Sequence, residues 1–273
     1  MSIISPNGLL APNRIVSPNR LNTPSYGGDL VVPWTPSVIS TDGWWDVSDN
    51  STITEVGGIV TQIDDKSGNN IDLIANSVTT DNHTLLTAAL NGLDVVDLDG
   101  DDRYNATSFL LSSGNVSFIM VCKVDVIDNS LDSILSMTGT SSFQYQSASS
   151  TNFLASLTGP DSTTSTTNTD YKGAYRIFNA LFDLSGSTQY SFVDGTQEGS
   201  SAYTTQLSNS TSLRVFTNRG QSAYPAGQIA EILVVPDASV ATRQKLEGYL
   251  AHKWGLTANL PSGHPYKASQ PTV

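Results

Sequence analysis

The sequence has little cysteine, little glutamate and no long apolar run, and each shortage excludes a class of protein. Its single cysteine, Cys122, rules out an internal disulfide framework, and the apolar run FIMVCKV around it predicts a buried thiol. No stretch is long and apolar enough to cross a bilayer, so we expect no membrane partner. Pro6, Pro12 and Pro18 interrupt any signal-peptide core, which predicts synthesis in a cytoplasm and no need for disulfides.

Basic residues are also scarce, and the net charge of −12 is unevenly distributed. Up to residue 43, Arg14 and Arg20 balance Asp29 and Asp42, so the whole −12 belongs to the remainder of the chain. We expect no nucleic-acid partner, because phosphate contacts need clusters of lysine and arginine. Before Asp29 the chain has no carboxylate, and this mildly basic segment is suited to docking on another protein.

The first 40 residues contain four near-copies of one hexapeptide. Proline recurs every six residues, with an aliphatic residue three positions before it, and four such sites rule out a helix. The repeat is compatible with a disordered tail, an extended arm in a groove, a stack of turns, or a stem of wound copies. We predict an extended anchoring arm over 1–40, because a disordered linker rarely keeps an aliphatic residue in register. Its expected contact residues are Ile3, Pro6, Leu9, Pro12, Arg14, Ile15, Pro18, Arg20, Leu21 and Pro24.

Short β-branched runs separated by polar turns fill most of residues 41–273. Strands at this spacing predict an all-β, two-sheet antiparallel sandwich. One helix is expected at 239–255, with Ser239 as its N-cap, an apolar stripe and Gly255 after its end. The stripe consists of Leu246, Tyr249, Leu250 and Trp254, and it predicts a helix packed on the sandwich.

The body also resembles a known family. GWWDVSD, VTQIDDKSGNN, NGLDVVDLDGDD, GQIAEILVV and RQKLEGYLAHKWGL with LPSGHPY are similar to motifs of concanavalin A-like (laminin-G-like) jelly-roll domains in structural proteins of tailed bacteriophages. The resemblance runs from about Trp44 to Tyr266, and the ending EGYLAHKWGL…HPY is its most specific part. It implies a jelly roll on the exterior of a virion, and it leaves the activity open, since this fold hosts lectins, glycanases and structural modules.

Catalysis is not expected. Glycanases of this fold place two glutamates on one strand, and glycoside hydrolysis needs two carboxylates at a set separation. The four glutamates of this chain lie far apart in sequence, at Glu55, Glu198, Glu231 and Glu247. An Asp-only pair at Asp97 and Asp99 is the one glycanase arrangement left, and no GxSxG elbow surrounds any serine.

The sequence contains candidate residues for two ligand sites. Exposed tyrosines near loops would stack on a sugar, and the candidates are Tyr104, Tyr145, Tyr171, Tyr203 and Tyr224; packing on the sandwich rim is the alternative. The run DLDGDD brings Asp97, Asp99, Asp101 and Asp102 together as hard oxygen ligands for calcium. The alternative there is a tight Asp-Gly turn with solvated carboxylates, and no other cofactor is expected.

These observations favour a non-enzymatic virion structural protein. The main hypothesis is a capsid decoration or cement protein, in which the arm binds the major capsid protein or other virion proteins and the jelly roll is displayed with weak glycan affinity. The alternative is a tail-associated fibre or spike that recognises host surface polysaccharide through a trimeric stem; a glycanase is the remote third. We expect a homo-oligomer, made in the host cytoplasm and located on the virion exterior, on the capsid surface rather than the tail.

Overall fold

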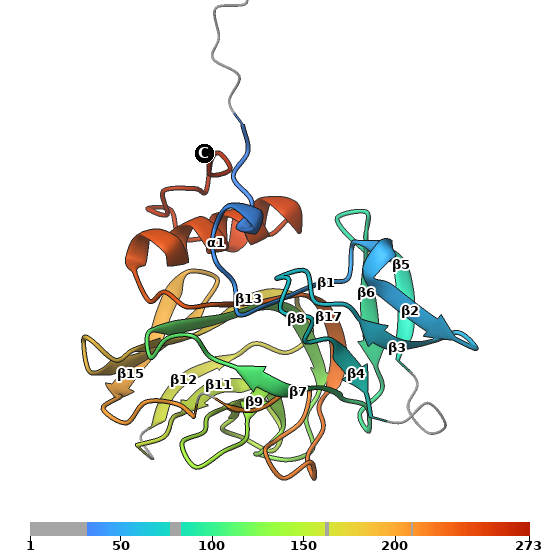
Figure 1. Cartoon of the computed structure of the whole chain (residues 1–273), viewed down its shortest axis with the longest axis horizontal. Coiled ribbons are helices and arrows are strands. Elements are labelled where there is room, and N and C mark those ends of the chain that lie inside the picture. Colours follow the sequence, from blue (N-terminus) through green and yellow to red (C-terminus); the bar gives the residue numbers. More distant parts are fainter. Residues whose placement is uncertain (1–31, 77–82, 162–163, 209) are drawn as a thin grey trace, which may run out of the picture. The chain divides into compact units, whose positions relative to one another are not determined.

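Two antiparallel β-sheets packed face to face form the body of the protein (Figure 1). The structure is a computed structural model, and it describes residues 32–76, 83–161, 164–208 and 210–273. The predicted contact residues of the arm, at positions 3–24, lie outside these ranges. The predicted β-sandwich is confirmed.

The first sheet follows the order β15-β14-β13-β8-β17-β6-β5, and β1 also pairs with β17. Its central strands are apolar on both faces, because one face meets the second sheet and the other meets a helix. The strands are β1 (Gly43–Asp46), β5 (Thr84–Leu90), β6 (Leu93–Leu98), β8 (Val116–Val126), β13 (Arg176–Asp183), β14 (Thr188–Val193), β15 (Thr196–Ala202) and β17 (Ala226–Val235).

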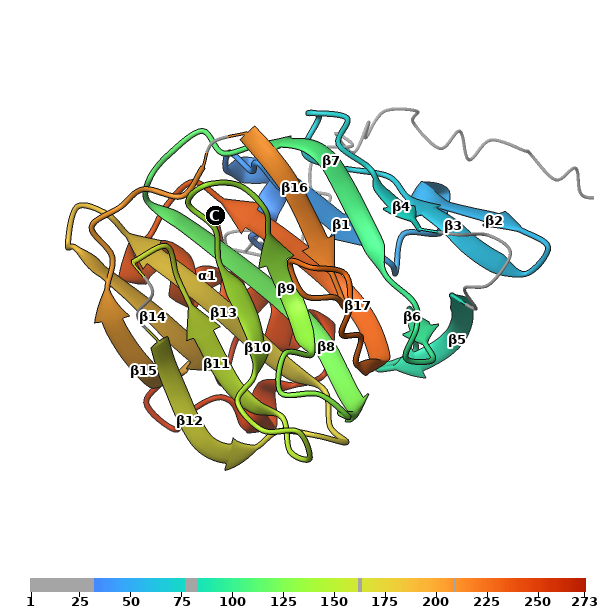
Figure 2. The same cartoon turned by 90° about the horizontal axis from the view of Figure 1, so that it is seen from below.

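The second sheet follows the order β12-β11-β10-β9-β16-β7-β4-β3-β2, and it lies in front in Figure 2, with the helix behind. Its strands are β2 (Ile53–Val56), β3 (Ile59–Ile63), β4 (Leu73–Ala75), β7 (Tyr104–Leu110), β9 (Ser133–Met137), β10 (Gln144–Ser147), β11 (Leu154–Thr158), β12 (Thr164–Asp170) and β16 (Ser210–Val215). Three short 3-10 turns complete the elements: η1 (Pro36–Val38), η2 (Asn50–Thr52) and η3 (Thr257–Asn259).

The main core lies between the sheets and is rich in aromatic rings. Phe118, Phe143 and Phe182 contact one another with ring centroids 4.6–6.0 Å apart. Burying such rings removes large apolar areas from water, which is the main stabilising term for a chain without disulfides. Cys122 lies in this core, as predicted, and burial raises the pKa of its thiol.

Helix α1 (Val240–Lys253) covers the outer face of the first sheet (Figure 1). The Ser239 hydroxyl accepts a hydrogen bond from the backbone N–H of Thr242, and Gly255 takes a φ of +72°, so both predicted end signals are confirmed. Leu246 and Leu250 pack against the sheet with Trp254 in a second apolar cluster. No helix among the described residues is long and apolar enough to cross a membrane.

The compact body begins at Pro33 rather than at residue 41. Pro33 bridges to Thr272, and the N–H of Trp34 donates to the carbonyl of Pro271 at 2.9 Å. The Trp34 side chain is buried in the helix cluster, with its ring edge-on to Tyr249. Residues 33–40 therefore belong to the body, because the Trp34 ring packs on α1 and the Trp34 backbone is hydrogen-bonded to the C-terminal segment.

Candidate functional site

Charged residues from the motifs that carry the family resemblance meet where α1 packs on the first sheet. Glu231, in the centre of β17, is fully buried. Its carboxylate accepts hydrogen bonds from the indole N–H groups of Trp44 and Trp254, each at 2.8 Å. The Tyr249 hydroxyl donates to the same carboxylate at 3.1 Å. Strand β1 and helix α1 with its C-cap thus converge on one buried acid of β17.

Lys253 joins this acid to a second one. Its ammonium donates to Glu231 at 2.8 Å and to Asp46 at 2.6 Å. Asp46 lies directly opposite Glu231 in the pairing of β1 with β17. Its carboxylate also forms an ion pair with the Lys66 ammonium at 3.1 Å. Burial raises the pKa of Glu231, and the neighbouring Asp46 carboxylate raises it further. Burial also opposes ionisation of Asp46, but Lys253, Ser48 and Lys66 outweigh it and lower the pKa of that carboxyl.

A second buried group fixes the other end of the helix. Arg243 donates to both carboxylate oxygens of Glu247, at 2.7 and 2.8 Å, and its guanidinium lies 4.1 Å from the ring centroid of Phe192. The Nδ1 atom of His264 accepts from the N–H of Tyr266 at 3.2 Å, so Nε2 carries the hydrogen that faces Glu247 at 3.1 Å. This triad ties the C-terminal segment to α1.

The buried carboxylate pair Asp46–Glu231 was not foreseen from the sequence. The two residues come from opposite ends of the body, and only the register of β1 with β17 places them side by side. Both are at most 4% exposed, and the Lys253 ammonium bridges them. Such a pair cannot meet a polysaccharide, so we interpret these motif residues as the dock of α1.

Four of the five tyrosines proposed to contact glycans are buried in the core, and the expectation that they are exposed is wrong. They are Tyr104, Tyr145, Tyr171 and Tyr203. They point inward because their apolar rings fill the space between the sheets; the hydroxyls of Tyr104 and Tyr203 donate to the carbonyls of Val60 and Gly114. Tyr224 alone keeps a partly exposed ring, in the loop between β16 and β17.

The aspartates proposed for calcium do not all lie together. Asp97 accepts from the Gln228 amide at 2.8 Å, across the pairing of β6 with β17. Ligand atoms of Asp99, Asp101 and Asp102 lie within 4.8 Å of one another, close enough for three carboxylates to share one cation.

The Asp99–Asp102 loop yields a direct prediction. If it binds calcium, millimolar calcium should raise the Tm by a few degrees relative to EDTA, since a ligand at about 100 times its Kd adds roughly 2.7 kcal/mol. Asp101→Asn should abolish that shift without altering the Tm in EDTA, because Asp101 is exposed. An identical Tm in calcium and EDTA would remove the site from consideration.

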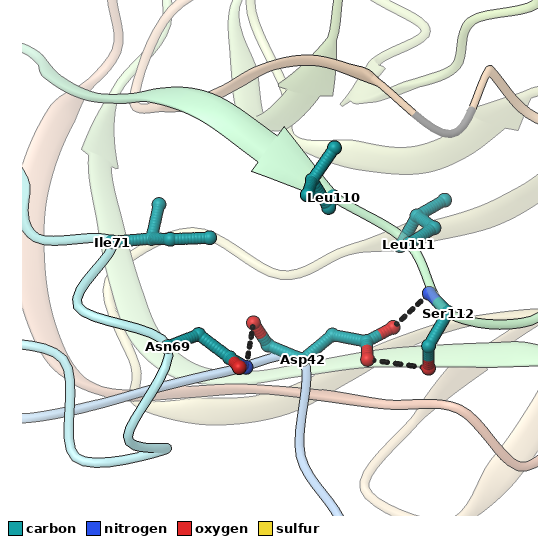
Figure 3. Close-up of a pocket in the computed structure, with 6 residues that line it drawn as sticks. All are labelled: Asp42, Asn69, Ile71, Leu110, Leu111 and Ser112. Carbon is teal, nitrogen blue, oxygen red and sulfur yellow. Dashed lines mark hydrogen bonds between the residues drawn. The ribbon is translucent and has the colours of Figure 1, made fainter.

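One surface pocket lies beside the start of β1 and has a volume of about 420 Å³ (Figure 3). Ile71, Leu110 and Leu111 provide its apolar wall. Its polar side chains are already engaged: the Asp42 carboxylate accepts from the hydroxyl and the N–H of Ser112, and the Asn69 amide donates to the Asp42 carbonyl. A ligand there would have to displace these bonds.

A second pocket, smaller than the first, is a cleft of about 250 Å³ between the first turn of α1 and the outer face of β13–β15. Leu181, Tyr190 and Phe192 form its apolar floor, and the Tyr190 and Phe192 rings lie 6.0 Å apart. Asp183, Gln197 and Arg243 add polar side chains. No hydrogen bond among the described residues engages the Gln197 amide, which is exposed. No sequence pattern predicts this cleft, because its residues come from three strands, α1 and the loop before it.

No protein-family model matches the chain, and no curated protein matches it either. Solved structures of botulinum neurotoxin do share the fold. One is the serotype D ligand-binding domain in complex with N-acetylneuraminic acid, with a TM-score of 0.50, 8% identity and coverage of 76% of this chain and 50% of that chain. Another, of type C, concerns cell entry through two ganglioside molecules, with a TM-score of 0.50, 10% identity and coverage of 77% and 51%. The chain thus spans about half the length of these structures, and at this identity the likeness shows the fold alone.

Proposed function

We propose that the chain is a non-enzymatic, glycan-binding display protein, in which the sandwich binds sugar in the cleft below α1 and the N-terminal arm attaches it to a larger assembly. The observation that carries the binding role is the cleft itself. It combines the partly exposed ring of Tyr190 with the exposed amide of Gln197. The Asp183 carboxylate and the Arg243 guanidinium lie beside them and are held in place by Ser185 and Glu247. Such a combination suits a pyranose, whose apolar face packs on a ring while its hydroxyls form hydrogen bonds.

The comparisons and the buried acids support a binding role over a catalytic one. Two proteins of this fold are described with N-acetylneuraminic acid and with gangliosides, so the fold is compatible with sugar binding. Glycoside hydrolysis needs a carboxyl pair that reaches the scissile bond. Asp46 and Glu231 are enclosed beneath α1, and the cleft contributes one carboxylate, Asp183.

We expect Tyr190→Ala to weaken glycan binding by about tenfold, because losing a stacked ring costs on the order of 1 kcal/mol or more. Gln197→Ala should weaken it several-fold without changing the Tm, since that amide is exposed. The measurement is a glycan array followed by calorimetry on the best ligand, with Leu110→Ala in the larger pocket as the matched control. Loss of binding in Leu110→Ala but not in Tyr190→Ala would contradict the assignment of the cleft.

The arm is proposed to anchor the protein to a virion, with capsid decoration favoured over a tail position. The support is the repeat itself, which presents one aliphatic residue every six positions from Ile3 to Leu21. An assembly of identical subunits offers evenly spaced sites, and a homo-oligomer of sandwiches would convert weak glycan affinity into avidity. A copy number near that of the major capsid protein supports decoration; a trace copy number supports the tail.

Deleting residues 1–30 should leave a folded body with an unchanged Tm, because the compact unit begins at Pro33. The truncated chain should no longer join particles, as measured by co-sedimentation. A full-length variant with serine at Ile3, Leu9, Ile15 and Leu21 should behave like the deletion. Normal incorporation of either variant would refute the anchoring role.

A further inference from the structure

Three arginines gather on the outer face of the second sheet, around the loop that joins β16 to β17. Arg214 in β16 pairs with Asn105 of β7, and Arg103 lies two residues before Asn105, on the same face. Side chains in this diagonal relation reach one another across two strands. Arg219 follows in the loop.

The described groups that these arginines contact are all neutral. Arg103 donates through Nε to the Gln221 side chain at 2.9 Å, and its guanidinium carbon lies 5.2 Å from the Tyr224 ring centroid. Arg214 donates to the carbonyl of Arg219. Arg219 donates to the side-chain oxygens of Gln144 and Ser142, at 2.9 and 2.6 Å.

Within the described ranges no carboxylate forms an ion pair with this cluster, which is unusual for so acidic a chain. Arg176 and Arg243, the other arginines of the body, each pair with a carboxylate. Among the described residues, no ion pair joins Arg103, Arg214 or Arg219 to an acid, although Asp101 and Asp102 precede Arg103 in the chain. The cluster therefore concentrates positive charge on a body that carries the whole net charge of −12.

Donor capacity at the cluster is left unused. The two terminal nitrogens of Arg103 make no hydrogen bond to a described residue, and the buried Nε of Arg214 has no partner. Burial lowers the pKa of Arg214, and the nearby charge of Arg103 lowers it further. An oxyanion would offset the repulsion between the two guanidinium groups and accept hydrogen bonds from their free N–H groups. A guanidinium presents a planar fork of donors that matches a carboxylate or a sulfate.

We propose that Arg103 and Arg214, with the partly exposed ring of Tyr224, form a second binding site, which takes the carboxylate or sulfate group of an acidic polysaccharide. This site goes beyond the proposed function, since it lies on the sheet opposite to the one that bears the Tyr190 cleft. A ligand bound here is held by charge, and its affinity falls with salt.

The test uses the full chain and three polymers: polygalacturonate, dextran sulfate and neutral dextran. We expect both charged polymers to bind at ~0.02 M salt and to be released at ~0.3 M, as charge-driven contacts require, and neutral dextran to fail at both. Arg103→Gln should weaken binding by at least about tenfold and Arg103→Lys by less, because lysine keeps the charge but loses the fork. The control Lys245→Gln removes the same charge from α1 and should change binding less than about twofold.

Equal losses of polymer affinity in Arg103→Gln and Lys245→Gln would overturn the site, because binding would then depend on the net charge of the protein alone. Titrations with inorganic sulfate and with galacturonate monomer distinguish binding of a free anion from binding of a polymer. If sulfate shifts the side-chain N–H resonances of Arg103 and Arg214 but neither polymer binds, the polysaccharide assignment is wrong. Tyr190→Ala should leave polyanion binding unchanged, so the two sites fail independently.

Discussion

Replacing Lys253 with methionine is expected to lower the free energy of unfolding by about 3–5 kcal/mol, because breaking a buried ion pair by removing one partner leaves an uncompensated charge. Lys253 is the ammonium that Asp46 and Glu231 share, and Glu231 is fully buried. Chemical denaturation measures the change. Lys245→Met is the matched control on the same helix, since Lys245 belongs to no ion pair among the described residues, and it should cost less than about 0.5 kcal/mol.

The cost of Lys253→Met should depend on pH. Burial and the Asp46 carboxylate already raise the pKa of Glu231 in the folded protein, and losing the ammonium raises it further. A group whose pKa is raised on folding binds more protons in the folded state, so stability falls as pH rises through the window above its unfolded value of 4.5. The variant should therefore recover stability between about pH 7 and pH 5, relative to wild type. A cost that does not vary with pH would mean that the carboxylates are not the source of the destabilisation.

Replacing Glu247 with alanine is expected to cost about 2–4 kcal/mol, since it leaves Arg243 without its counter-charge in a largely buried position. It also removes the acceptor of His264, which lies in the segment after the helix. Gly195 packs here, and a Cβ on it would lie 3.3 Å from the Glu247 carboxylate, so there is little room for water to replace the lost groups. Thermal and denaturant unfolding measure the effect.

Two further variants separate the sources of the Glu247 effect. Glu247→Gln keeps one acceptor and should cost less than the alanine variant. Glu55→Ala removes a carboxylate from exposed strand β2 and should change stability by less than about 0.5 kcal/mol. Equal stability of Glu247→Ala and Glu55→Ala would contradict the role of the triad as an anchor.

The sequence predicted those features that depend on local patterns. Helix α1 was predictable because a serine cap, a stripe of apolar residues and a following glycine all lie within one stretch. The Asp194–Gly195 turn between β14 and β15 has an equally local cause, because an Asp-Gly pair favours the positive φ that both residues adopt in this two-residue hairpin.

Features that depend on strand pairing were not predictable. Tyr104 and Tyr224 both lie near loops, but Tyr104 begins β7 and faces the core, whereas Tyr224 stays in the loop and is partly exposed. Asp97 is only two positions from Asp99 in the sequence, but its carboxylate accepts a hydrogen bond from Gln228 on a neighbouring strand instead of joining the other aspartates. Asp46 and Glu231 became a pair only through the register of β1 with β17. These contacts depend on strand order and register, which local sequence patterns do not specify.

The most direct test of the account measures binding and cleavage on the same samples. The full chain is incubated with a panel of neutral and acidic polysaccharides, and retention and newly formed reducing ends are both recorded. We predict retention of at least one polysaccharide, weakened by Tyr190→Ala or Arg103→Gln, with no reducing ends formed. Release of reducing ends that Glu231→Gln abolishes would contradict the account, because it would make the buried acids of the helix dock a catalytic pair.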